Sequence, residues 1–137
     1  MTSVSLSAPR AVSVSARRAG RVLSALAVAF LAFDAVIKLV VAKPVVDSFA
    51  QLGWPAHLAV TVGVLELACL AVYLVPRTAV LGAVLLTGYL GGAIATHVRL
   101  ENPLFSHVLF PTYVAALVWG GLYLRDRRLS ALFSATR

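Results

Sequence analysis

Four ionisable side chains fall inside or at the edge of long apolar runs of the sequence: Asp34, Lys38, Glu66 and His97. A fifth, Arg99, follows the third of these runs. A charge at the centre of a membrane costs roughly 2.5–3.5 kcal/mol on insertion scales, so an ionisable residue there by default has a functional role and a partner. We therefore take the five residues as candidates for ligand binding or for a proton relay.

The candidates fall in the same half of the expected membrane layer. With a helical rise of about 1.5 Å per residue, Lys38 lies roughly 6 Å below the outer end of its span, Asp34 roughly 12 Å and Glu66 roughly 15 Å. His97 and Arg99 lie at the rim. One interpretation is a polar pocket that opens to the external side and binds a small polar head group, such as a quinone ring, or relays protons.

The other interpretation is that these residues only fix the packing of the helices. Asp34 and Lys38 are four residues apart, on one helix face, and can pair with each other. Glu66 then pairs with a hydroxyl group or with Arg99, because buried polar pairs hold membrane helices together. The sequence leaves both interpretations open.

Metal and haem sites are not expected. His57, His97 and His107 all fall near the external face, and two facing histidines can ligate a haem while three can bind a metal. No spacing in the sequence enforces either geometry. The single cysteine, Cys69, lies in an apolar run and cannot form a disulfide within the chain. The sequence contains no dinucleotide fingerprint, P-loop, nucleophile elbow or H-E-x-x-H motif, so we expect no independent catalytic activity and assign no catalytic residue.

The composition indicates that these residues lie in a membrane protein. Of 137 residues, 61% are hydrophobic and only 12% are charged, and the mean hydropathy is +0.93. A span takes about 20 residues, so four fit in the chain. We expect an all-α integral membrane four-helix bundle over residues 21–126, between a flexible basic N-terminal tail (1–20) and a basic C-terminal tail (127–137). The expected spans are about 22–42, 56–75, 78–98 and 104–124.

The sequence also predicts the form of two connections between the spans and one face for helix packing. Residues 43–55 have the pattern of a short amphipathic helix at the membrane surface, with a disordered loop as the alternative. The fourth span begins between Leu104 and Pro111, which decides whether His107 lies in a loop or in the membrane. In the third span, small residues recur every fourth position and form a face on which another helix can pack closely. These small residues are Gly88, Gly92 and Thr96.

The basic residues indicate the orientation. The net charge is +7, and most of the basic residues lie outside the apolar runs. This distribution favours a role in membrane topology and in contact with anionic lipid over a role in nucleic-acid binding. Nine arginines fall on one side and Lys43 and Arg99 on the other, so the positive-inside rule predicts that both termini are cytoplasmic. The nine are Arg10, Arg17, Arg18, Arg21, Arg77, Arg125, Arg127, Arg128 and Arg137.

Several segments resemble one known family. The motifs are LGWP at 52–55, GVLELA at 63–68, the stretch PRTAVLGA…TGYLGGAIATHVR at 76–99, LFP at 109–111 and WGGLYLRD at 119–126. Together they resemble the DoxX-like family of small four-helix bacterial membrane proteins, over about residues 25–133. The resemblance implies a four-span bundle in the bacterial cytoplasmic membrane. It also implies a distant link to DoxX, a membrane subunit of a thiosulfate:quinone oxidoreductase.

We therefore expect an accessory or anchor subunit of a membrane oxidoreductase, with a link to quinone. The bilayer is one partner, and an oxidoreductase subunit or a second copy of the chain is another. Two alternatives remain. One is a carrier of small solutes or protons, which would need a polar route through the inner half of the bundle. The other is a purely structural membrane protein that docks through the small-residue face.

Overall fold

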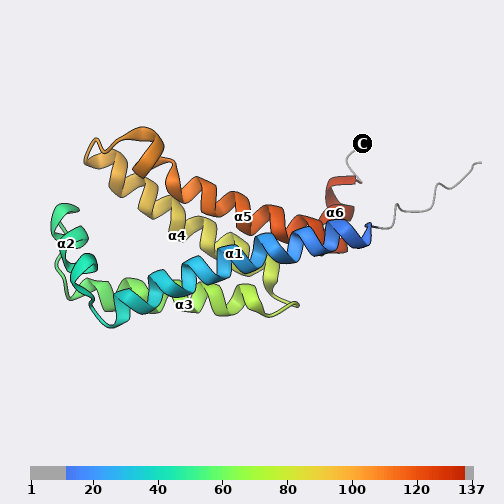
Figure 1. Ribbon diagram of the computed structural model, residues 1–137, viewed down its shortest axis with the longest axis horizontal. Helices are drawn as coiled ribbons and strands as arrows, with labels where there is room; N and C mark the ends of the chain where they lie inside the picture. Colours follow the sequence, from blue (N-terminus) through green and yellow to red (C-terminus); the bar gives the residue numbers. More distant parts are fainter. Residues whose placement is uncertain (1–11, 135–137) are drawn as a thin grey trace, which may run out of the picture.

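The computed structural model describes residues 12–134, which are mostly helical and contain no strand. Four long helices, α1, α3, α4 and α5, are joined by short connections and by smaller helical elements (Figure 1). The elements are α1 (Val14–Leu39), α2 (Lys43–Gln51), α3 (Leu58–Leu74), α4 (Ala79–Arg99), the π-helical segment η1 (Leu104–Val108), α5 (Phe110–Arg125) and α6 (Arg127–Ser134).

The helices have the length and composition of membrane helices. Three segments are long and apolar enough to cross a bilayer: Val14–Leu39, Ala79–Arg99 and Leu104–Arg125. Leu58–Leu74 is also apolar but has only 17 residues. Many large apolar side chains on the outside of the helices are exposed, as expected where lipid replaces water. The expectation of an all-α membrane protein is confirmed.

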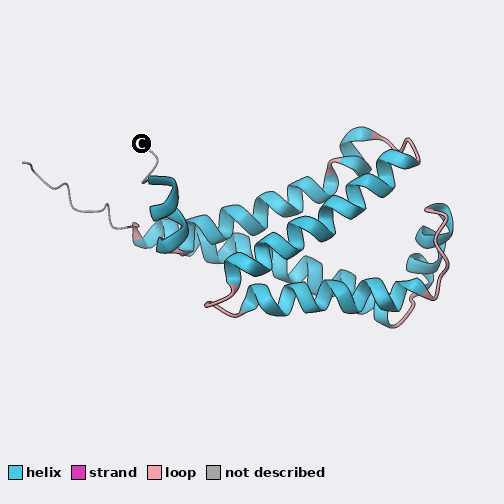
Figure 2. Ribbon diagram, turned by 180° about the vertical axis from the view of Figure 1, so that it is seen from behind, coloured by secondary structure: helices cyan, strands magenta, loops and turns pink. Residues whose placement is uncertain are grey.

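The long helices form a ring in which α1 packs on α3 and α5, while α4 packs on the same two helices. Figures 1 and 2 show that the helices lie together at the end that carries α6 and the start of α1. Toward the opposite end, where α2 lies, the α4–α5 pair diverges from α3. The two halves of the bundle therefore differ in how tightly they pack.

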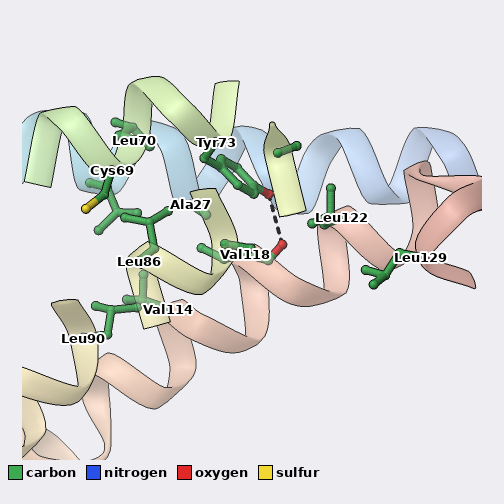
Figure 3. Packing of buried hydrophobic residues seen from close by; sticks show 13 residues of the cluster. Ala27, Cys69, Leu70, Tyr73, Leu86, Leu90, Val114, Val118, Leu122 and Leu129 are labelled. Carbon is green, nitrogen blue, oxygen red and sulfur yellow. Dashed lines mark hydrogen bonds between the residues drawn. The ribbon is translucent and has the colours of Figure 1, made fainter. Parts of the chain in front are cut away.

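The half beside α6 is a closely packed core (Figure 3). Tyr73 is buried there, and its hydroxyl donates to the carbonyl oxygen of Val118 at 3.0 Å and lies 3.1 Å from Ser24 Oγ. Gly82 lets α4 approach α3 closely, because a Cβ at this position would lie 2.2 Å from the backbone nitrogen of Tyr73. Gly121 plays the same role between α5 and α1, where a Cβ would lie 2.7 Å from the backbone nitrogen of Ser24. The remaining core is mostly aliphatic.

The ends of the chain are more helical than we expected. Helix α1 begins at Val14 rather than near residue 22, because Ser13 caps it by accepting a hydrogen bond from the backbone nitrogen of Ala16 at 3.2 Å. Residues 14–20 of the expected flexible tail are therefore helical, and residues 1–11 lie outside the described part of the chain. The expected C-terminal tail contains α6, followed by three residues that the structure does not describe.

The two connections are also helical. Helix α2 occupies most of residues 43–55, with Pro44 in its first turn, and buries Val45 and Phe49. The fourth long helix begins at Leu104 as one π-helical turn and continues as α5 from Phe110. His107 therefore lies in the helical segment that precedes α5, not in a loop.

Candidate functional site

A polar cluster links three helices in the less tightly packed half of the bundle. It consists of Asp34 and Lys38 on α1, Glu66 on α3 and Tyr89 on α4. Lys38 Nζ donates to Glu66 Oε2 at 2.9 Å, to the Tyr89 hydroxyl at 2.7 Å and to Asp34 Oδ2. The Tyr89 hydroxyl in turn donates to Glu66 Oε2 at 2.9 Å. We call these four residues the lysine cluster.

Burial differs sharply within the lysine cluster. The side chain of Glu66 is 0% exposed and that of Lys38 is 12% exposed, whereas Asp34 retains 31%. Glu66 Oε1 is buried and has no hydrogen-bond partner among the described residues. Lys38 therefore holds two carboxylates with one ammonium group, and the buried carboxylate depends on Lys38 and Tyr89 for all its hydrogen bonds.

A cavity of about 830 Å³ lies beside the lysine cluster, between the diverging helices and α2. Three members of the cluster, Asp34, Lys38 and Tyr89, lie in its wall. Glu66 does not line the cavity and lies behind Lys38 and Tyr89. The cluster thus presents one ammonium, one carboxylate and one phenol to the cavity.

The rest of the cavity wall is mostly apolar. Cys69 and Leu90 contribute to its floor, and Phe49 and Trp54, in edge-to-face contact at 6.2 Å, contribute from α2 and the following turn. Leu65 of α3 and Val84 of α4 line the cavity although each is about half exposed. The cavity is therefore continuous with the outer surface of the bundle between α3 and α4, where we expect lipid.

His97 lies in the cavity wall and is held by a neighbouring amide. The side-chain nitrogen of Asn102 lies 2.9 Å from His97 Nδ1. The His97 ring also contacts the ring of His107 edge to face at 5.7 Å. Because an amide nitrogen only donates, this contact places the neutral ring proton of His97 on Nε2.

Arg99 has a different environment from the other candidates. One of its guanidinium nitrogens donates to the carbonyl oxygen of Leu52 at 2.7 Å, which ties the end of α4 to the end of α2. Glu66 pairs instead with Lys38 and the Tyr89 hydroxyl. The alternative in which Arg99 is the partner of Glu66 is therefore wrong. The hydroxyl alternative for Glu66 and the Asp34–Lys38 pair are both observed.

Two further expectations concern metals and glycines. Within residues 12–134, no group of three His, Cys, Asp or Glu side chains is arranged to hold a metal ion. Gly88 and Gly92 line the cavity, and a Cβ at either position would meet nothing within 4 Å. Within residues 12–134 nothing lies close enough to fill these positions, so their role as a packing face for another chain stays a prediction, together with that of Thr96.

Residues 22–121 match the family model described as the DoxX-like family, and this range contains the whole lysine cluster and the polar and apolar walls of the cavity. The chain belongs to the DoxX-like family. No curated protein and no solved structure gives a match. The match ends at residue 121, so α6 and the basic residues around it lie outside the family model of this DoxX-like protein.

Of the candidates from the sequence, Asp34, Lys38 and Glu66 lie together and His97 lies in the cavity wall of the DoxX-like protein. Two contributions to the cavity were not predicted. Tyr89 was not among the candidates, although a tyrosine within an apolar span needs a partner for its hydroxyl, which is a usable signal. The contribution of α2 and Trp54 to the cavity depends on how the connection folds back over the bundle end. No spacing in the sequence shows that.

Proposed function

We propose that the DoxX-like protein is an accessory or anchor subunit of a membrane oxidoreductase and binds a quinone in the cavity between its helices. The observation that carries the proposal is a large apolar cavity with its polar groups confined to one part of the wall. A quinone has the same division, with a polar ring and an apolar tail. An opening toward lipid between α3 and α4 would admit such a molecule directly from the bilayer.

The polar wall offers groups of both kinds that a quinone and its reduced form need. His97 Nε2 carries a proton for a quinone carbonyl, given the contact of Nδ1 with Asn102. Asp34 binds Lys38 through Oδ2, which leaves Oδ1 as an acceptor for the hydroxyl group of a hydroquinone. Ligand pockets are typically apolar with a few placed polar groups, and this cavity follows that pattern.

Lys38 in the cavity wall and Glu66 behind it support this site. The ammonium group of Lys38 is already shared among Asp34, Glu66 and Tyr89, so Lys38 holds the Asp34 carboxylate in place. Glu66 fixes Lys38 and Tyr89 without lining the cavity. We expect Glu66 to act as a positioning residue and Asp34 and His97 to contact the ligand.

Binding of a short-chain quinone analogue to the purified protein in mild detergent tests the proposal. We expect Glu66→Gln to weaken binding, because an amide holds Lys38 less firmly than a carboxylate does. Glu101→Gln is the matched control, since Glu101 lies exposed in the turn after α4. Absence of binding to the parent protein, or equal binding by parent and Glu66→Gln, would remove the quinone from the proposal.

The proposed topology has four spans in a bacterial cytoplasmic membrane, with both termini in the cytoplasm. Helix α3 has 17 residues, which gives a length of about 25 Å at 1.5 Å per residue. It packs on both α1 and α4 and runs antiparallel to both, which supports α3 as the fourth membrane span. The arginine-rich ends of the chain support the orientation. Reporter fusions after residues 54, 77, 102 and 137 test it: we expect the second and fourth to report cytoplasm and the other two the opposite side.

A pull-down in mild detergent tests for the partner subunit. An absorption spectrum of the eluate shows whether any haem or flavin co-purifies with a partner enzyme.

A second copy of the chain is the alternative partner. The face of α4 that carries Gly88, Gly91 and Gly92 is favoured for docking of a partner, because nothing lies within 4 Å of a Cβ built at any of these glycines. Gly92→Leu should then reduce assembly, and intact assembly would count against this face.

The packed half of the bundle argues against the alternative of a carrier. Tyr73, Leu86, Val118 and Leu122 are each at most 1% exposed and fill the centre of that half. A carrier needs a route through this region in some state. Proton or solute flux into proteoliposomes that depended on Glu66 would favour the carrier over the proposed subunit.

A further inference from the structure

Arginines gather around a small pocket at the end of the bundle opposite α2. The pocket has a volume of about 280 Å³ and lies between the turn that joins α3 to α4 and the connection from α5 to α6. Its charged lining consists of Arg77, Arg125, Asp126, Arg127 and Arg128, and its apolar lining includes Ala79 and Leu122. We call it the arginine pocket.

The positive charge of the arginine pocket exceeds the negative charge in its lining, and no ion pair within residues 12–134 neutralises it. None of its four guanidinium groups forms an ion pair within residues 12–134. Asp126 accepts from the backbone nitrogen of Arg128 at 2.8 Å, as an N-terminal cap of α6. Counting four arginines and one aspartate, the lining carries a net charge of +3.

Arg125 has a hydrogen-bond donor that no acceptor of the described residues meets. Its Nε is buried and has no hydrogen-bond partner among the described residues. Its guanidinium carbon lies 5.2 Å from the centre of the Tyr73 ring, which fixes the group in place over the core. Leaving a buried guanidinium N–H without an acceptor costs free energy, which an anion at this position would recover.

From this arrangement we infer that the arginine pocket binds the phosphate group of an anionic glycerophospholipid. Arginine forks match phosphate oxygens with paired hydrogen bonds, which a lone positive charge cannot do. Basic pockets between the ends of membrane helices are suited to anionic lipid head groups. The inference does not depend on quinone binding, which concerns the other half of the bundle.

The surroundings of the pocket favour a lipid over a soluble phosphate. Helix α6 runs across the end of the bundle (Figure 1), buries Leu129 and leaves Leu132 67% exposed. Leu74 and Val75, just before the turn that carries Arg77, are also about half exposed. A lipid phosphate in the pocket would therefore have apolar side chains beside it for its acyl chains, at the membrane surface that we expect at this end of the bundle.

The test uses the full chain, stripped of lipid in mild detergent, and native mass spectrometry with added lipids. We expect retention of phosphatidylglycerol and little retention of phosphatidylcholine, whose head group has no net charge. The variant Arg77→Gln/Arg127→Gln removes two exposed arginines of the pocket. At roughly 1 kcal/mol for each arginine near an anionic head group, it should weaken phosphatidylglycerol binding by on the order of tenfold or more.

Arg18→Gln/Arg21→Gln is the matched control, because it removes two exposed arginines from the same end of the bundle outside the pocket. Retained binding in this control supports the site, whereas an equal loss in both double variants shows only a general charge effect and overturns it. Equal retention of the two lipids by the parent chain overturns it without any variant. Binding of soluble glycerophosphate as strongly as phosphatidylglycerol would replace the lipid by a free phosphate ester and overturn the commitment to lipid.

Discussion

Lys38 of α1 and Glu66 of α3 form an ion pair, with Nζ and Oε2 2.9 Å apart, in which the glutamate side chain is completely buried. Tyr89 of α4 closes the arrangement by bonding to both residues. Helix α4, which diverges from α3 on this side of the bundle, is therefore joined at one point to both α1 and α3. The same point forms the polar part of the cavity wall, so structure and proposed ligand binding depend on the same hydrogen bonds.

Lys38→Met tests the structural part of this relationship. The variant keeps the length and apolar stem of the side chain but leaves the Glu66 and Asp34 carboxylates without their cation. Breaking a buried ion pair by removing one partner costs about 3–5 kcal/mol. We expect a loss of that order in the free energy of unfolding, measured by denaturant titration in detergent micelles with circular dichroism.

The chain supplies a matched control for Lys38→Met. Lys43 and Asp47 are also a lysine–aspartate pair four residues apart, at 2.8 Å, but their side chains are 86% and 55% exposed. Exposed pairs contribute about 0–1 kcal/mol, so Lys43→Met should leave the free energy of unfolding nearly unchanged. Equal losses for the two variants would mean that burial does not strengthen the Lys38 pair.

The double variant Lys38→Met/Glu66→Leu makes a separate prediction. Replacing both partners of a buried ion pair by apolar groups is often neutral or stabilising. Asp34 keeps 31% of its side chain exposed and can be hydrated in the variant. We therefore expect the double variant to unfold at a higher denaturant concentration than Lys38→Met alone. A double variant less stable than the single one would show that Glu66 contributes through contacts other than the lysine.

The sequence predicts the lysine cluster only in part, for a physical reason. The Asp34–Lys38 pair follows from the helical repeat, because both residues lie on one turn of one helix. The pairing of Lys38 with Glu66 and Tyr89 depends on the rotation of α1, α3 and α4 about their axes. Apolar composition does not fix these rotations in a helix that is hydrophobic on all sides, so the partner of Glu66 was left open.

The glycines illustrate the same limit. A spacing of four residues identifies Gly88 and Gly92 as one face, but both border the cavity, and among the described residues nothing lies within 4 Å of a Cβ built at either. The close helix contact of α4 is made instead at Gly82, one turn after the helix begins. Which small residue meets a neighbour depends on the short connection between α3 and α4, whose geometry the repeat does not describe.

Gly82→Ala and Gly91→Ala form a third test. At Gly82 the added methyl would lie 2.2 Å from the backbone nitrogen and 2.3 Å from the Cα of Tyr73, so α3 and α4 must move apart. Overpacking of this kind typically costs 1–3 kcal/mol. At Gly91 nothing lies within 4 Å, and alanine is preferred over glycine within a helix by about 0.5–1 kcal/mol. Denaturant titration should therefore move the two variants in opposite directions from the parent, and a stable Gly82→Ala would contradict the close approach.

Tyr73→Phe tests the packed half of the bundle. The variant keeps the ring in the core and removes the hydroxyl that donates to the Val118 carbonyl at 3.0 Å (Figure 3). The same hydroxyl lies 3.1 Å from Ser24 Oγ. Because Ser24 is buried and loses this partner, we expect a loss of about 1–2 kcal/mol in the free energy of unfolding. Tyr123→Phe is the control, since this tyrosine is exposed and its ring packs on Phe133. If both variants unfold like the parent, the hydroxyl of Tyr73 does not hold α1, α3 and α5 together, and the stability of this half rests on its aliphatic packing alone.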